Sequence, residues 1–168
     1  MRKLLFKSFV QGPLTEAAPA ADEAAIAELA ARVHGAARRR LGRTLAIREV
    51  DAGSCNACEL EIHALNNVLY DLERFGFRFV ASPRHADVLL VTGPVTVHMR
   101  EALERTYAAT PDPKWVVAVG DCARDGGVFA GSTACVGSVA AVVPVDLHIP
   151  GCPPSPLALL KGLLALLE

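Results

Sequence analysis

The chain has 168 residues, of which 52% are apolar and 21% are charged, and its formal net charge is −1. This apolar fraction excludes a disordered chain, and the length suits one compact domain with its own core. The nearly balanced charge gives no sign of a nucleic-acid-binding protein.

The charge is unevenly distributed along the chain. Residues 1–50 carry nine basic and five acidic side chains, whereas residues 51–168 carry eight and thirteen. We therefore predict two parts: an N-terminal basic arm and helix over residues 1–43, and an α/β domain over residues 44–168. The basic arm suits contact with a membrane surface or an acidic partner, and it suits a solvated helix face equally well.

The termini and apolar runs bear on the compartment. No run reaches the roughly 18 apolar residues that a membrane-spanning helix needs. The first residues resemble a signal peptide, but Lys7 interrupts the apolar region and Gly12-Pro13 ends it. We therefore expect a cytoplasmic protein.

The first half of the chain alternates between helix and strand patterns. An Ala-rich segment at 21–40 has acidic residues early and arginines late, which favours a helix through its dipole. A strand is predicted at 44–50, then a loop at 51–57. A helix over 58–74 and a short strand at 77–81 follow.

The second half contains two continuous apolar runs, 87–92 and 115–119, which are typical of parallel strands covered on both faces. A helix at 96–109 separates them, and a Gly-rich loop follows Cys122. We predict a last strand at 140–143 and a final helix from Pro156 to Leu167. The alternation predicts an α/β fold with an open, mostly parallel sheet and flanking helices.

Five cysteines are present, and an odd number without an export signal argues against a disulfide framework. Cys55, Cys122 and Cys152 each follow a predicted strand region. Since ligands of such sheets lie beyond the carboxyl ends of the strands, we expect these thiols at one edge. Cys135 lies among small residues and is interpreted as a buried free thiol.

The chemistry of these cysteines favours a metal cluster. Cys55 and Cys58 form a C-x-x-C pair, Cys122 lies in a glycine-rich segment, and Cys152 is followed by Pro153. Four thiolates arriving from different directions are what a [4Fe–4S] cluster needs, and a following proline recurs at such ligands. A zinc-stabilised interaction module and a thiol–disulfide enzyme remain alternatives at this point.

Five motifs in order resemble the 20 kDa subunit family shared by respiratory complex I and membrane-bound [NiFe] hydrogenases. They are CNACELE (55–61), RFG (74–76), SPRHAD (82–87), GDC (120–122), and the segment from VPVD to PGCPP (143–154). The resemblance implies a flavodoxin-like fold that holds one [4Fe–4S] cluster. Carried over residue by residue, the cluster ligands are Cys55, Cys58, Cys122 and Cys152, and Cys135 matches no ligand position.

The resemblance also implies partners and a branch of the family. Complex I members carry two adjacent cysteines at the first ligand site, whereas this chain has two residues between Cys55 and Cys58. That spacing is similar to the group 4 hydrogenase branch, which includes the formate hydrogenlyase and hydrogenase-4 type. We expect an electron-transfer subunit beside the [NiFe] site of a large catalytic subunit. A ferredoxin-like iron–sulfur subunit and membrane-anchored subunits would hold it at the inner face of the cell membrane.

The alternative within the same chemistry is a complex I-type NADH–quinone oxidoreductase subunit that passes electrons to quinone. Glu59 is a candidate for a proton route near the cluster. It equally suits the first turn of a helix, where acidic residues stabilise the dipole. The five histidines show no metal-like spacing and are interpreted as surface or packing residues.

Overall fold

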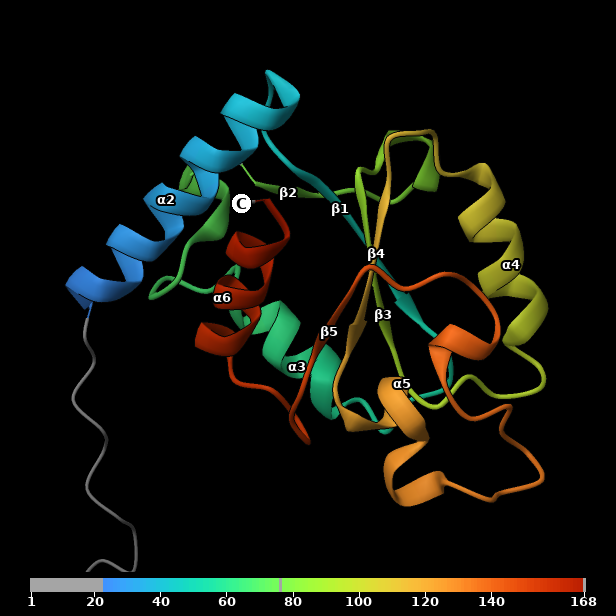
Figure 1. Ribbon diagram of the computed structural model, residues 1–168. Coiled ribbons are helices and arrows are strands. Elements are labelled where there is room, and N and C mark those ends of the chain that lie inside the picture. Colours follow the sequence, from blue (N-terminus) through green and yellow to red (C-terminus); the bar gives the residue numbers. More distant parts are fainter. Residues whose placement is uncertain (1–22, 76, 168) are drawn as a thin grey trace, which may run out of the picture.

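The computed structural model describes residues 23–75 and 77–167 (Figure 1). The helices are α2 (Glu23–Leu41), α3 (Ala57–Ala64), α4 (Arg100–Ala109), α5 (Asp121–Asp125) and α6 (Pro156–Leu167). The strands are β1 (Ala46–Asp51), β2 (Arg78–Phe79), β3 (Val88–Thr92), β4 (Trp115–Val119) and β5 (Leu147–Ile149). Four 3₁₀ segments join them: η1 (Leu72–Phe75), η2 (Pro83–His85), η3 (Gly127–Phe129) and η4 (Val139–Ala141).

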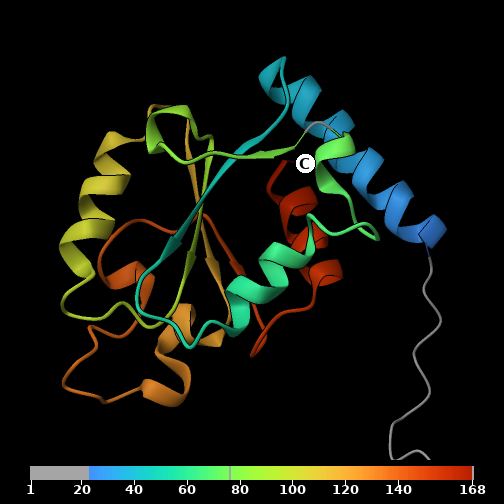
Figure 2. The same cartoon turned by 180° about the vertical axis from the view of Figure 1, so that it is seen from behind.

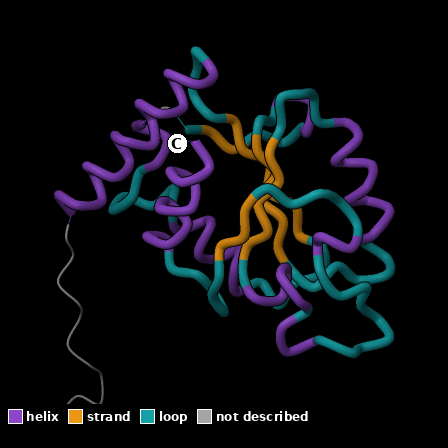
Figure 3. Tube along the Cα trace, viewed as in Figure 1, coloured by secondary structure: helices purple, strands orange, loops and turns teal. Residues whose placement is uncertain are grey.

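The five strands form one sheet in the order β2-β1-β3-β4-β5, and every neighbouring pair is parallel. This is the flavodoxin-like order, with its switch point between β1 and β3. The structure thus confirms the predicted fold class. The two apolar runs predicted to be central strands are β3 and β4, at the centre of the sheet (Figure 3).

Helices cover both faces of the sheet, as Figures 1 and 2 show from opposite sides. Strand β3 explains why, because its residues alternate between two apolar clusters. Val88 and Leu90 pack with α2, α3 and α6, whereas Leu89 and Val91 pack with α4 and α5. A strand that is buried on both faces must be apolar at every position, which accounts for the unbroken run in the sequence.

An ion pair fixes the segment between α2 and β1 to the start of β3. The Asp87 carboxylate is buried and accepts hydrogen bonds from Arg43 Nη1 at 2.9 Å and from the Ala46 backbone N–H at 2.9 Å. Arg43 Nη2 lies 2.5 Å from the second carboxylate oxygen, so the pair is bidentate. Val33 of α2 packs in the same core cluster as α6. The domain boundary at residue 43 stays a prediction.

The prediction of one helix over 58–74 is wrong in its second half. Helix α3 ends at Ala64, because the Asn67 side chain accepts hydrogen bonds from the backbone N–H groups of Leu69 (2.9 Å) and Tyr70 (3.0 Å). Such local side-chain bonds compete with the helix and favour a turn. The chain then returns to the core at Leu72.

The last strand is also displaced from its predicted position. Residues 140–143 are not a strand, since η4 occupies Val139–Ala141, and the strand is β5. Asp146 explains why the last strand forms at 147–149. Its backbone N–H donates to the Val116 carbonyl at 2.9 Å, and its side chain accepts from the Val116 N–H at 2.7 Å. These two bonds align the following residues with β4. The final helix α6 has the predicted bounds.

Candidate metal centre

The carboxyl ends of β1, β4 and β5 lead directly to the four cysteines predicted as ligands. Cys55 follows β1, and Cys58 lies in the first turn of α3. Cys122 lies in the first turn of α5, directly after β4. Cys152 follows β5. Both ribbon views show the start of α3, the helix α5 and the chain after β5 side by side (Figures 1 and 2).

The four thiols are close enough to influence one another. Burial raises the pKa of the Cys58 thiol to about 12, and the charges of Glu59 and of the other three thiols add to this rise. Burial also raises the pKa of Cys122, again with contributions from Cys152 and Cys55. Cys135 contributes to neither. The structure therefore brings together the four cysteines that the sequence analysis selected.

Glycine at position 120 leaves room for the Cys58 thiol. A Cβ atom built on Gly120 would lie 2.7 Å from Cys58 Sγ, and the backbone there has a φ of +87°. Both conditions exclude larger residues, since L side chains rarely adopt this φ and no real Cβ contact is so short. Gly127 has the same relation to Cys122, with a Cβ-to-Sγ distance of 2.9 Å.

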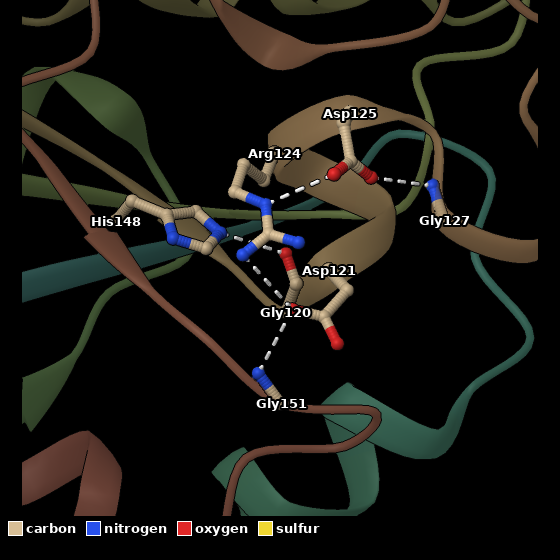
Figure 4. A network of polar contacts seen from close by, with 7 residues as sticks. All are labelled: Gly120, Asp121, Arg124, Asp125, Gly127, His148 and Gly151. Carbon is tan, nitrogen blue, oxygen red and sulfur yellow. Dashed lines mark hydrogen bonds and ion pairs between the residues drawn. The ribbon is translucent and has the colours of Figure 1, made fainter.

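Backbone hydrogen bonds tie the segment of Cys122 to that of Cys152. The Gly120 N–H donates to the Ile149 carbonyl at 2.8 Å, and the Asp121 N–H donates to the Gly151 carbonyl at 2.9 Å. In return, the Gly151 N–H donates to the Asp121 carboxylate at 3.2 Å (Figure 4). Two cysteine segments 30 residues apart in sequence are therefore held in a fixed relation.

His148 is a residue that the sequence analysis missed. Its Nε2 atom donates to the Gly120 carbonyl at 3.1 Å, which fixes the peptide group just before the Cys122 helix (Figure 4). The only sequence signal was its place four residues before Cys152, and this spacing has no meaning until β5 is paired with β4. His148 is thus a support for the cysteine edge.

The turn after Cys122 is stabilised by Asp125. Its carboxylate accepts from the Gly127 N–H at 2.9 Å and from Arg124 Nε at 3.0 Å (Figure 4). The bond from Gly127 and the neighbouring guanidinium lower the pKa of Asp125. The turn directs the Val128 backbone N–H to the Cys122 thiol, and this bond opposes the rise in the pKa of Cys122.

These observations test whether the residues fit an iron–sulfur cluster. Four thiols come from three segments, glycines leave space beside two of them, and a backbone N–H faces one sulfur, as is common around clusters. Within residues 23–75 and 77–167, no three Cys, His, Asp or Glu side chains are gathered as ligands of one metal ion. A four-iron cluster binds one thiolate per iron and needs no such close gathering. The donor set fits the cluster.

Glu59 and Cys135 complete the set of predicted residues. The Glu59 side chain is 5% exposed, and neither of its carboxylate oxygens has a hydrogen-bond partner. It is therefore a buried acid beside Cys58, and it lies in the first turn of α3, where its charge favours the helix dipole. Cys135 is a free thiol, half-buried where a buried one was predicted, and its backbone bridges to Thr96.

Comparison with known proteins identifies the family. The family model described as NADH ubiquinone oxidoreductase, 20 Kd subunit, matches residues 55–166. The chain belongs to this family. It is therefore an oxidoreductase subunit, and the resemblance drawn from the five motifs is confirmed.

Two curated members of this family are similar to the chain. The probable membrane-bound hydrogenase subunit mbhJ of Pyrococcus furiosus is 48% identical over 76% of this chain and 77% of its own length. Formate hydrogenlyase subunit 7 of Escherichia coli is 46% identical over 74% of this chain, and the chain spans about half (49%) of that relative. Both carry names from the hydrogenase branch.

A solved structure of the membrane-bound sulfane sulfur reductase, an archaeal respiratory membrane complex, contains a similar chain. The two share 35% identity and a TM-score of 0.67, and the match covers 82% of this chain and 74% of the other. None of the described helices of the present chain is long and apolar enough to cross a membrane.

Proposed function

We propose that this chain holds one [4Fe–4S] cluster through Cys55, Cys58, Cys122 and Cys152 and serves as the electron-transfer subunit of a membrane-bound hydrogenase-like complex. The observation that carries the proposal is the convergence of these four thiols at the carboxyl edge of the sheet. When bound, the cluster supplies one-electron transfer between partner groups.

The residues around the thiols would control the surroundings of the cluster. Gly120 and Gly127 keep side-chain atoms away from two sulfurs, and the Val128 N–H donates to Cys122. Hydrogen bonds to cluster sulfurs and limited solvent access set the reduction potential. The unpartnered carboxylate of Glu59 is the nearest candidate for a proton route, as the sequence suggested.

The rim of the cysteine edge suits a protein partner. Cys55 and Cys152 are exposed, and so are three apolar side chains: Leu60 (60% exposed), which follows Cys58, and Val128 (79%) and Phe129 (38%), which follow Cys122. Exposed apolar residues that follow ligand cysteines closely in the sequence favour a surface that another subunit covers. We infer that a large catalytic subunit, which supplies the nickel ligands, packs on this edge.

The remaining partners are inferred from the relatives. The hydrogenase and formate hydrogenlyase relatives, with the C-x-x-C spacing of Cys55 and Cys58, favour a cluster proximal to a [NiFe] site. A ferredoxin-like iron–sulfur subunit would exchange electrons with this chain, and membrane-anchored subunits would hold it at the cytoplasmic face. A complex I-type subunit that reduces quinone is the alternative that the family name supports.

The experiment is iron and sulfide analysis with low-temperature EPR on the anaerobically purified complex. We expect about four irons per chain and an EPR signal on reduction. If hydrogen gas reduces the cluster and produces this signal, the hydrogenase branch is supported. If NADH reduces the cluster and quinone is turned over, the complex I branch is supported. Zinc without iron would overturn the electron-transfer function in favour of a zinc-stabilised interaction module.

A further inference from the structure

Strand β5 directs its middle side chain towards the segment of Cys122. The residues on either side, Leu147 and Ile149, pack in the core cluster that contains α6. Gly162 of α6 lies directly against them, because a Cβ atom there would be 2.4 Å from Ile149 Cδ1. Since side chains alternate along a strand, His148 points to the opposite face of the sheet, where α5 lies.

The imidazole of His148 and the backbone of β5 together hold the residue Gly120. The Gly120 N–H donates to the Ile149 carbonyl at 2.8 Å, and the Gly120 carbonyl accepts from His148 Nε2 at 3.1 Å (Figure 4). The same carbonyl accepts from the Arg124 backbone N–H at 3.3 Å, which is a longer bond. Gly120 is therefore bonded to β5 through both of its backbone polar groups.

The orientation of Gly120 bears on two of the four thiols. Gly120 comes two residues before Cys122, and a Cβ atom on it would lie 2.7 Å from Cys58 Sγ. Its φ of +87° and ψ of 164° are permitted to glycine but are not imposed by it, because glycine has the widest choice of conformations. A bond to its carbonyl restricts rotation of the peptide group between Gly120 and Asp121.

The bond from His148 needs neither uptake nor release of a proton. A carbonyl oxygen only accepts, so His148 Nε2 must carry the hydrogen, and it does so in one neutral tautomer and in the cation alike. The bond comes from a side chain, and the pairing of β5 with β4 is made by the backbone. Loss of this bond should therefore leave the sheet intact.

We propose that His148 is a positioning residue for the cluster, because its Nε2–H holds the Gly120 carbonyl and thereby sets the place of the Cys122 thiol and the reduction potential. The inference rests on the proposed cluster. The imidazole N–H offsets the negative end of the Gly120 carbonyl dipole. Without that donor, the carbonyl would disfavour an electron added at the cysteine edge, since dipoles act strongly where little water is present.

The test is an EPR-monitored redox titration of the purified complex at one fixed pH, with iron and sulfide analysis of each variant. His148→Phe keeps an aromatic ring but removes the donor, whereas His148→Gln keeps an N–H donor. His85→Phe is the matched control, because His85 is exposed and lies just before β3, at the opposite end of the strands from the cysteines.

The donor should decide the result. We expect His148→Phe to retain about four irons per chain, to change the EPR line shape, and to make the reduction equilibrium about three- to tenfold less favourable. A tenfold change corresponds to a fall of about 59 mV in the midpoint potential of a one-electron couple. His148→Gln and His85→Phe should both have the wild-type line shape and potential, which a merely space-filling role of the imidazole does not predict.

Two results would overturn the proposal: a His148→Phe complex with the wild-type line shape and potential, or an equal shift in His148→Gln. If His148→Phe loses its iron, His148→Gln decides, because wild-type iron and potential there support the proposal and their loss overturns it. Failure of the proposed function is distinguishable. A wild-type complex without iron would contradict the cluster itself, whereas an unchanged signal in His148→Phe would refute only the role of His148.

Discussion

The cysteine edge and the layer formed by α2 and α6 are built by different means. At the cysteine edge, glycines with positive φ and backbone hydrogen bonds fix individual atoms around the thiols. In the helical layer, buried leucines of α6 fill volume against α2 and the sheet. The comparison indicates that the first region depends on exact backbone geometry, while the second depends on the amount of apolar surface removed from water.

The largest effect is expected from a methyl group at the cysteine edge. Gly120→Ala puts a Cβ atom 2.7 Å from Cys58 Sγ, in a backbone conformation that alanine rarely adopts, and should abolish cluster binding. Gly131→Ala is the matched control, because its φ of +81° is similar but no atom lies within 4 Å. Iron and sulfide per chain are the measurement, and equal loss in both variants would contradict the steric account.

Substitutions in the helical layer should change the free energy of unfolding and leave cluster binding intact. Leu160→Ala removes a fully buried side chain and should lower the free energy of unfolding by about 2–5 kcal/mol. Leu157→Ala on the same helix is 37% exposed and should change it by about 0.5 kcal/mol or less. Chemical denaturation checks both, and the iron content of the folded fraction should stay at the wild-type value.

A smaller loss is expected where α2 joins the sheet. Asp87→Asn breaks the bidentate pair with Arg43 and should cost about 1–3 kcal/mol, since a buried hydrogen-bonding group loses a charged partner. Glu101→Gln removes a largely solvent-exposed pair with Arg105 and should cost about 0.5 kcal/mol or less. Thermal unfolding of the two variants would contradict the account if their midpoints fell equally.

The smallest effect concerns Glu49, whose charge is made unfavourable by burial and by the neighbouring acidic side chains of Glu59 and Asp51. Because its pKa is raised in the folded chain, the folded state binds a proton more tightly than the unfolded state. Its favourable contribution is therefore present at pH below the ordinary value of 4.5 and is lost as the pH rises through the raised pKa. Glu49→Gln should become more stable relative to wild type over this range, as denaturation at several pH values would measure.

The same contrast explains what the sequence could predict. The strands β3 and β4 and the helix α6 follow from apolar runs and from Pro156, because local composition and burial on two faces decide them. The four cysteines were predictable as a group, since each follows a strand or opens a helix at one edge of the sheet.

Features decided by contacts distant in sequence were not predictable. Residues 140–143 have a stronger strand pattern than β5, but only Asp146 bonds to Val116 and aligns the chain with β4. The support of Gly120 by His148 requires that pairing to exist first. The early end of α3 had a local signal in Asn67, which the apolar periodicity of the following residues concealed.

The central claim is that four of the five cysteines hold one cluster. Its most direct test is iron and sulfide content, with the EPR signal of the reduced complex, for five single Cys→Ala variants. We predict that Cys55, Cys58, Cys122 and Cys152 variants lose the signal and that Cys135→Ala retains about four irons per chain. Loss of the cluster in Cys135→Ala, or an intact four-iron signal in any of the other four, would contradict the account.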